Sequence, residues 1–355
     1  MRTAIVLLVL LGSMTSIADS AEVRLVAGGG TGKDGGPAIG AKLHEPFGVA
    51  WDKEGRLIIV EMGGHCVRRI DAKGVISTAV GTGDKGFGGD GGASTESRLN
   101  GPHAILVDGS GTILISDTWN DRVRAIDAKG AVRTVVGSGK KGFGGDGGPA
   151  LEAKFGGIYC TAVSKDGQRL YVADLDNRRI RKIDRKTGIV TTVAGDGSKG
   201  IPRDGSEAIR SPLMDPRAVA VDADENIWIL ERDGHALRVV DAAGRIRTVA
   251  GTGKKGYSGD GGPASMATMS GPKYLCVAPD GSILIADTEN HAIRRYTPKD
   301  GTITTVAGTG RKGSNGIDGP PEKLQLDRPH GVEVHSSGDI YISDSDNHRV
   351  VRIVK

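Results

Sequence analysis

The stretch RPHGVEVHSSGDIYISDSDNHRVVRIV (328–354) decides the fold, because it holds three short apolar segments separated by turn residues. The segments GVEVH, IYISD and RVVRIV are rich in Val and Ile, whereas Gly, Ser, Asp and Asn fill the intervals between them. Val and Ile runs bounded by such residues are typical of β strands. The stretch therefore predicts three consecutive strands.

The same unit occurs six times along the chain, at intervals of 56 to 58 residues. The equivalent opening positions are Pro46, Pro102, Ile158, Pro216, Pro272 and Pro329. A short fourth strand, such as TVVG or TVAG, follows the third strand of the repeat. Four strands per repeat describe one blade of a β-propeller, so we expect an all-β chain folded as a six-bladed β-propeller.

The two ends of the chain predict how the ring closes. The last copy stops after its third strand, whereas RLVAG (24–28) has the pattern of a fourth strand with no third strand before it. We therefore expect the N-terminal strand to close the last blade. This arrangement also removes an open sheet edge, which would otherwise favour aggregation.

The repeat pattern in 328–354 resembles the NHL repeat, in its opening proline, its Gly-Val strand and the acid and Asn that follow the second strand. The connector TVAGTG…GDGGPA is similar to that of bacterial exported NHL proteins and of the teneurin propeller. The resemblance covers essentially the whole chain after residue 20 and implies a six-bladed NHL β-propeller. It does not specify the function, because NHL propellers include RNA binders, protein-interaction modules and lyases.

The first twenty residues have the pattern of a signal peptide. Arg2 precedes an apolar run from Ala4 to Leu11, and small residues follow up to Ser20. We expect 1–20 to be a signal peptide, 21–355 to be the propeller, and the protein to be exported to the periplasm or outside the cell. The apolar run is too short to span a bilayer, and no later segment is apolar enough to do so.

The charge balance bears on nucleic acid binding, and the spacing of the cysteines bears on disulfide formation. The chain has 47 basic and 43 acidic residues, an excess too small to indicate nucleic acid binding. Nucleic acid is therefore an unlikely partner, also because the chain is expected to be exported. The three cysteines lie far apart in strand-like segments, so we interpret them as buried free thiols, with one disulfide and one free thiol as the alternative: Cys66, Cys160 and Cys276.

The connectors between blades are glycine-rich and carry at least one cation each, so we expect a basic crown on one face of the disc. Each connector also has an aspartate, which we interpret as the N-cap of one or two helical turns: Asp90, Asp146, Asp204, Asp260 and Asp318. A calcium site is the alternative, although one carboxylate per connector is few for a cation that prefers six to eight oxygens.

The acid that ends the second strand of each blade is interpreted as structural. We expect it to accept backbone amides of the DxxN bend that follows. The six acids are Glu61, Asp117, Asp174, Glu231, Asp287 and Asp344.

The residue after each opening position should lie at the mouth of the central channel, because the innermost strand starts there. These residues are Phe47, His103, Tyr159, Arg217, Lys273 and His330. Unlike the six acids, they differ from blade to blade, which is the pattern of a binding site for one asymmetric ligand. Arg217 and Lys273 favour an anion, and Tyr159 and Phe47 can stack on an apolar part of it.

Two of these residues raise the possibility of a metal. In peptidyl-hydroxyglycine amidating lyases, which are also six-bladed, zinc-binding histidines follow prolines in alternate blades, and His103 and His330 resemble this arrangement. The fourth blade departs from it, because it has Arg217 where a third histidine is expected. Zinc at His103 and His330 is therefore a possible cofactor, calcium is a less favoured one, and none is predicted outright.

The sequence thus favours an exported NHL propeller that binds a ligand or protein through its basic, loop-bearing face. Candidate partners are an anionic small molecule, a glycan or an acidic protein surface, and we expect a monomer. A metal-dependent lyase or lactonase at the channel mouth is the alternative, so whether the protein is an enzyme stays open.

Overall fold

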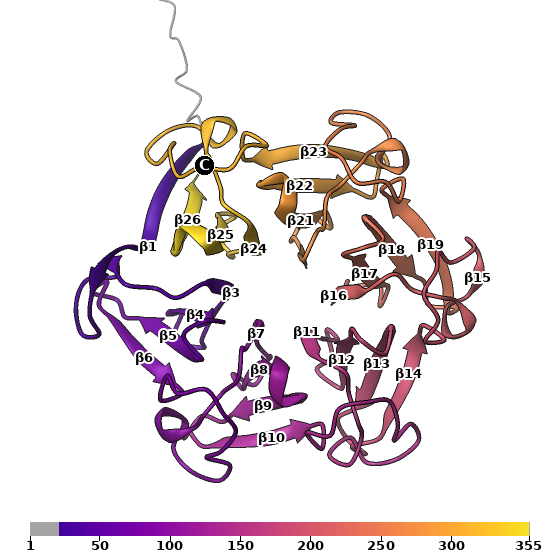
Figure 1. Ribbon diagram of the computed structural model, residues 1–355, viewed down its shortest axis with the longest axis horizontal. Helices are drawn as coiled ribbons and strands as arrows, with labels where there is room; N and C mark the ends of the chain where they lie inside the picture. The colour runs from indigo at the N-terminus through magenta and orange to yellow at the C-terminus, as the bar shows by residue number, and fades with distance from the viewer. Residues whose placement is uncertain (1–20, 355) are drawn as a thin grey trace, which may run out of the picture.

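The computed structural model describes residues 21–354, and the expected signal peptide lies outside this range. Six sheets surround a central axis, as Figure 1 shows, and their main strands are antiparallel. Within the described range, the regular structure is all β apart from seven three-residue 3-10 turns: η1 (Ser94–Glu96), η2 (Thr118–Asn120), η3 (Ala208–Arg210), η4 (Ala264–Met266), η5 (Thr288–Asn290), η6 (Pro321–Lys323) and η7 (Ser345–Asn347). The six-bladed β-propeller predicted from the repeats is confirmed.

Each blade has four main strands, numbered from the axis outward. The first two blades contain β3 (Pro46–Trp51), β4 (Leu57–Glu61), β5 (Cys66–Ile70) and β6 (Ile76–Val80), then β7 (Ala104–Val107), β8 (Ile113–Asp117), β9 (Arg122–Ile126) and β10 (Val132–Val136). The third contains β11 (Ile158–Val163), β12 (Arg169–Asp174), β13 (Arg179–Asp184) and β14 (Val190–Ala194). The fourth contains β16 (Pro216–Val221), β17 (Ile227–Glu231), β18 (Ala236–Val240) and β19 (Arg245–Ala250), with β15 (Ser206–Glu207) at its edge.

The last two blades complete the circle. The fifth contains β20 (Tyr274–Val277), β21 (Ile283–Asp287), β22 (Ala292–Thr297) and β23 (Thr302–Ala307). The sixth contains β24 (Pro329–Val334), β25 (Ile340–Asp344) and β26 (Arg349–Val354), followed outward by β1 (Glu22–Gly32) and β2 (Ile39–Ala41). The strand β1 runs antiparallel to β26, from the pair Glu22 and Val354 to the pair Gly28 and Arg349. Both ends of the described chain therefore belong to one sheet.

Each connector runs along the outer edge of the blade that it enters. The connector between the first and second blades shows this pairing: Gly91 N donates to Val132 O, and Val132 N donates to Gly92 O. Isolated bridges between Pro149 and Ile189 and between Pro263 and Thr302 repeat it in the third and fifth blades. The connectors therefore cover backbone groups that an outermost strand would otherwise expose.

The connector aspartates do not cap helices, so that interpretation is wrong. Asp90 instead accepts hydrogen bonds from Arg124 Nη2 (2.7 Å) and Thr134 Oγ1 (2.7 Å), which lie on the third and fourth strands of the next blade. Asp146 contacts Arg181 and Thr192 in the same way. Single 3-10 turns replace the expected helical turns in four of these connectors, at η1, η3, η4 and η6, and the aspartates fasten the connectors to their blades.

Replacing Asp90 with alanine is expected to lower the free energy of unfolding by about 1–2 kcal/mol, because two hydrogen bonds to a charged group are lost. Chemical denaturation of both proteins, with and without added Ca²⁺, measures the effect. A stabilisation by Ca²⁺ that disappears in the variant would contradict this structural role and support a calcium site.

The acid ending each second strand is buried and joins three parts of a blade. Asp117 accepts from the backbone N of Asn100 in the connector (2.7 Å), from Asn120 Nδ2 (2.8 Å) and from Arg124 Nη1 (3.4 Å). The backbone amide thus comes from the preceding connector, and the DxxN bend contributes a side-chain amide instead of the expected backbone amide. Burial raises the pKa of Asp117 to about 6.

Apolar side chains of neighbouring sheets form the core between the blades, and the three cysteines lie within it. All three are buried, and none of them forms a disulfide, which confirms the free-thiol interpretation. In residues 21–354, no helix has the length and apolar character needed to cross a membrane.

Candidate functional site

The start of each innermost strand places one side chain at the channel mouth. In four blades this residue is a β-bulge; for example, Pro46 pairs with Glu61 and Gly48 with Val60, so Phe47 has no partner on β4. The same shift occurs at Tyr159, Arg217 and His330. A bulge turns its side chain away from the regular alternation of a strand, so these four residues point out of the sheet packing.

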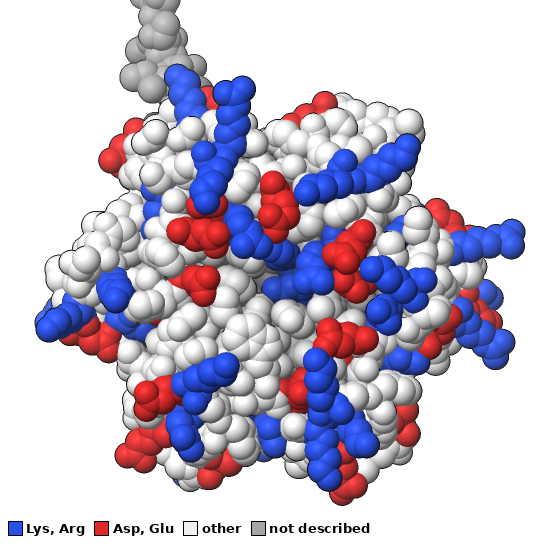
Figure 2. Space-filling model, viewed as in Figure 1, with Lys and Arg blue, Asp and Glu red and all other residues white. Residues whose placement is uncertain are grey.

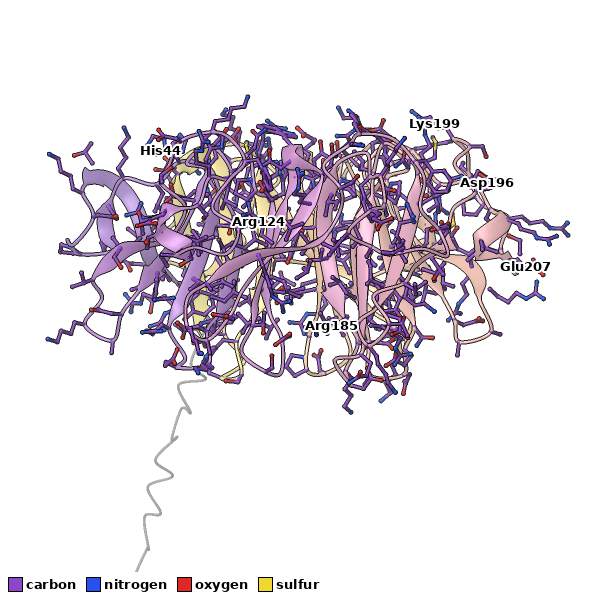
Figure 3. The ribbon with its side chains drawn as sticks, turned by 90° about the horizontal axis from the view of Figure 1, so that it is seen from below. His44, Arg124, Arg185, Asp196, Lys199 and Glu207 are labelled. Atoms are coloured by element: carbon purple, nitrogen blue, oxygen red, sulfur yellow. The ribbon has the colours of Figure 1, made fainter. Side chains whose placement is uncertain are left out.

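All six residues predicted from the repeat line one cavity of about 220 Å³. The cavity opens on the face that carries the connectors. In the side view of Figure 3, His44 and Lys199 of the connectors lie at one face, whereas Arg185, in the turn after β13, lies toward the other. The cavity is also lined by residues that the sequence analysis did not select: Glu45, Met62, Arg232, Arg328 and Asp346.

The six side chains contact one another in a continuous series. The ring of His330 stacks on Phe47 with centroids 4.0 Å apart and an interplanar angle of 8°. Phe47 meets His103 edge to face at 4.9 Å, and His103 meets Tyr159 at 4.7 Å.

Each end of this series is a cation. The Arg217 guanidinium carbon lies 4.1 Å from the centre of the Tyr159 ring, and Lys273 Nζ lies 3.4 Å from His330 Nε2. The six side chains are thus aromatic along one part of the series and cationic at its two ends.

Three of the four cations in the cavity wall are paired with carboxylates. Lys273 Nζ lies 2.8 Å from Glu289 Oε1, and Arg328 Nη2 lies 3.0 Å from the same oxygen. Arg232 Nη2 lies 2.8 Å from Asp215 Oδ2. Figure 2 shows Lys and Arg side chains gathered at the centre of this face, beside Asp and Glu side chains.

Arg217 is the exception. Only 5 % of the Arg217 surface is exposed to solvent. Within residues 21–354, its guanidinium has neither a salt bridge nor a hydrogen bond, and its partner is the Tyr159 ring. Burial lowers the pKa of Arg217 to about 10. A buried guanidinium with no counter-charge is costly, and an anion in the cavity would offset this cost.

The two ring histidines are held in one orientation by backbone carbonyls. His103 Nδ1 lies 2.7 Å from Gly101 O, and His330 Nδ1 lies 2.8 Å from Arg328 O. Because a carbonyl can only accept, Nδ1 carries the proton and Nε2 is left as an acceptor. Burial and the nearby Arg217 and Lys273 hold the pKa of both imidazoles well below the usual range.

The histidines alone make an incomplete metal site. The described part of the chain contains no group of three or more His, Cys, Asp and Glu residues placed to hold a metal ion. Catalytic zinc normally has three protein ligands, and Arg217 occupies the third expected position. Zinc at His103 and His330 stays a prediction that metal analysis has to test.

Three cations of the expected basic crown are paired with acids. Lys141, Lys199 and Lys312 are paired with Asp176 (2.8 Å), Asp233 (3.6 Å) and Asp327 (2.9 Å), respectively. Pairing with acids weakens the field of an exposed cation. The central cavity is therefore a better candidate site than the crown.

Sequence reasoning missed Glu289 and Arg328, although each occupies a variable position beside a fixed one. Arg328 precedes an opening proline, where the backbone φ is positive in each blade, with either glycine or a charged residue: Glu45, Gly101, Gly157, Asp215, Gly271 and Arg328. Glu289 lies inside the DxxN bend, two residues after Asp287. Both positions differ in residue type from blade to blade inside an otherwise constant motif, and this variation could have identified them as candidate site residues.

Comparisons with known proteins agree with the repeats. The family model described as "NHL repeat" matches residues 269–296 and 326–353. The chain is 27 % identical to NHL repeat-containing protein 2 of Gallus gallus, over 70 % of this chain and 38 % of that protein. It is 31 % identical to teneurin-1 of Mus musculus, over 59 % of this chain and 8 % of that protein. The chain thus spans less than half the length of these relatives.

Among solved structures, an auxiliary nutrient binding protein from Bacteroides thetaiotaomicron superposes with a TM-score of 0.67 at 18 % identity, over 94 % of this chain and 76 % of that one. This likeness concerns the fold alone. Two blades match the repeat model directly, one relative is named for the same repeat, and all six sheets contain four or five strands. The chain is therefore a six-bladed β-propeller that carries NHL repeats in its fifth and sixth blades.

Proposed function

We propose that this propeller binds a small organic anion with an apolar portion in its central cavity. The observation that carries the proposal is the unpaired, buried guanidinium of Arg217 in a cavity that aromatic side chains also line. A carboxylate or phosphate near Arg217 would supply the missing counter-charge. Phe47, His103 and Tyr159 would contact the apolar portion of the same ligand.

Two further considerations support a binding role. The cation–π contact with Tyr159 holds the Arg217 guanidinium in place, so little side-chain entropy is lost when an anion binds. A protein of the same fold is described as an auxiliary nutrient binding protein. With the signal-like residues 1–20, this supports a propeller that binds a small nutrient or metabolite after export.

Calorimetry with a panel of aromatic and aliphatic carboxylates, each beside its uncharged amide, tests the proposal. We expect at least one carboxylate to bind about tenfold or more tightly than its amide, because a charged hydrogen bond is worth about 1.5–3 kcal/mol. Equal affinities for acids and amides would contradict it. Stoichiometric zinc that is lost in His103→Ala would instead support a metal-dependent lyase or lactonase at this cavity.

The affinity of the cavity for a carboxylate or phosphate that carries no aldehyde or ketone group is expected to fall above about pH 8. Burial lowers the pKa of Lys273 to about 8, opposed by Glu289 and assisted by Arg328 and Arg217. His330 also faces the amine but is neutral in this range.

The sign of this effect follows from proton linkage. A bound anion favours the ammonium form of Lys273, so binding above pH 8 requires proton uptake. The affinity should fall by about twofold between pH 7 and 8 and then by up to about tenfold per pH unit. Calorimetry at pH 7, 8, 9 and 10 measures it, and Lys273→Arg should keep the affinity level to higher pH.

A further inference from the structure

The amino group of Lys273 lies in a setting that suits a reaction as well as a charge. Lys273 immediately precedes β20, its residue is only 8 % exposed, and it lines the central cavity. Its Nζ has two polar neighbours, Glu289 Oε1 at 2.8 Å and His330 Nε2 at 3.4 Å. The other lysines beside this face, such as Lys141, are exposed.

Burial favours the neutral amine of Lys273, Arg328 and Arg217 add to this effect, and the Glu289 carboxylate opposes it. Glu289 Oε1 is shared between Lys273 and Arg328, so one carboxylate serves two cations. Arg217 adds a third cation to the same cavity with no carboxylate of its own. Burial and these like charges hold the pKa of Lys273 at about 8, so a large fraction of the amine is neutral at mildly alkaline pH.

The two neighbours also orient the neutral amine. His330 Nε2 is an acceptor, because Nδ1 donates to the backbone carbonyl of Arg328. A neutral amine has two N–H bonds and one lone pair, and Glu289 and His330 accept from both N–H bonds. The lone pair is then the group left free for a ligand in the cavity.

We propose that Lys273 captures the carbonyl carbon of an oxo acid as an imine while Arg217 holds the carboxylate of the same molecule. This inference rests on the proposed function, since it uses the anion site at Arg217. It narrows the ligand class to small acids that carry an aldehyde or ketone. In this reaction His330 is a positioning residue, because it acts through the Lys273 amine.

The step balances without another reactant. The ammonium releases a proton to water, and the Nζ lone pair forms a bond to the carbonyl carbon while the C=O π pair moves to oxygen. A proton moves from nitrogen to oxygen and gives a neutral carbinolamine. Its hydroxyl takes up one proton and leaves as water as the nitrogen lone pair forms the C=N bond. The products are a protonated imine and water, with no net change in protons, and nothing is oxidised or reduced.

Reductive trapping of the full chain tests the inference. The protein is incubated at pH 8 with glyoxylate and cyanoborohydride, which reduces an imine to a stable secondary amine, and the modified lysines are identified by peptide mass spectrometry. We expect Lys273 to be labelled at least about tenfold faster than exposed lysines such as Lys254, because an ordinary lysine has a pKa near 10.4 and is almost fully protonated at this pH.

Two variants separate the parts of the proposal. Lys273→Arg should lose the specific label and keep its thermal unfolding midpoint. Arg217→Met should keep the amine but reduce labelling at Lys273 by tenfold or more, because the carboxylate is no longer held. Labelling of Lys273 that is unaffected by Arg217→Met would overturn the role of the anion site.

The outcomes also distinguish this inference from the proposed function. Suppose that labelling is spread evenly over the exposed lysines while a carboxylate without an aldehyde or ketone group binds normally. This result would contradict imine formation at Lys273 and would still support the anion site. A failure of both glyoxylate labelling and carboxylate binding would overturn both. Specific labelling of Lys273 that excess carboxylate suppresses would support both.

Discussion

Replacing Asp117 with alanine is expected to lower the free energy of unfolding by about 3–5 kcal/mol, because it leaves the buried Arg124 guanidinium without its inner carboxylate. Both side chains are fully buried, and Arg124 Nη1 lies 3.4 Å from Asp117 Oδ2. The substitution also removes the acceptor for the Asn100 amide and for Asn120 Nδ2. Urea denaturation of the two proteins measures the difference.

An exposed ion pair provides the matched control. Arg210 and Glu207 lie 3.3 Å apart, with 84 % and 49 % of their side chains exposed. Arg210→Ala should therefore cost at most about 1 kcal/mol. If Asp117→Ala costs no more than Arg210→Ala, the buried acid does not hold the blade together as described.

Arg217→Met is expected to weaken binding of a carboxylate about 100-fold without destabilising the protein. Methionine keeps an apolar stem beside the Tyr159 ring but cannot donate hydrogen bonds, so up to about 3 kcal/mol of binding free energy is lost. Removing a buried charge that has no counter-charge should leave the free energy of unfolding unchanged or raise it by about 1 kcal/mol. Calorimetry and urea denaturation measure the two effects.

Arg232→Met is the matched control for this prediction. Arg232 lines the same cavity, but Asp215 and Asp233 already compensate its charge. This variant should lose stability and retain most of the affinity, which is the reverse of the Arg217 result. A large loss of stability in Arg217→Met would mean that this arginine has a structural role.

The architecture and the six ring positions could be predicted because both depend on the repeat. Alternating Val and Ile segments specify strands, and a spacing of 56 to 58 residues places Phe47, His103 and the four equivalent residues at one radius. Each of these residues directly follows the opening position of its blade, and this rule alone predicted that all six would line one cavity, whatever their residue type.

The contacts within the site could not be predicted, because they depend on side chains from different blades. The sharing of Glu289 by Lys273 and Arg328 joins residues from two neighbouring blades, and the repeat alone does not indicate it. The connector aspartates were misread for a similar reason. Asp90 has its partners 34 and 44 residues away, whereas a helix cap is a local motif.

The β-bulges that carry the ring have an evolutionary consequence. At Phe47, Tyr159, Arg217 and His330, the strand pairing passes over the bulged residue, so its side chain is not needed to align the neighbouring strand. Mutation at these sites can thus change the chemistry of the central cavity one blade at a time, while the residues that pair the strands keep the fold unchanged.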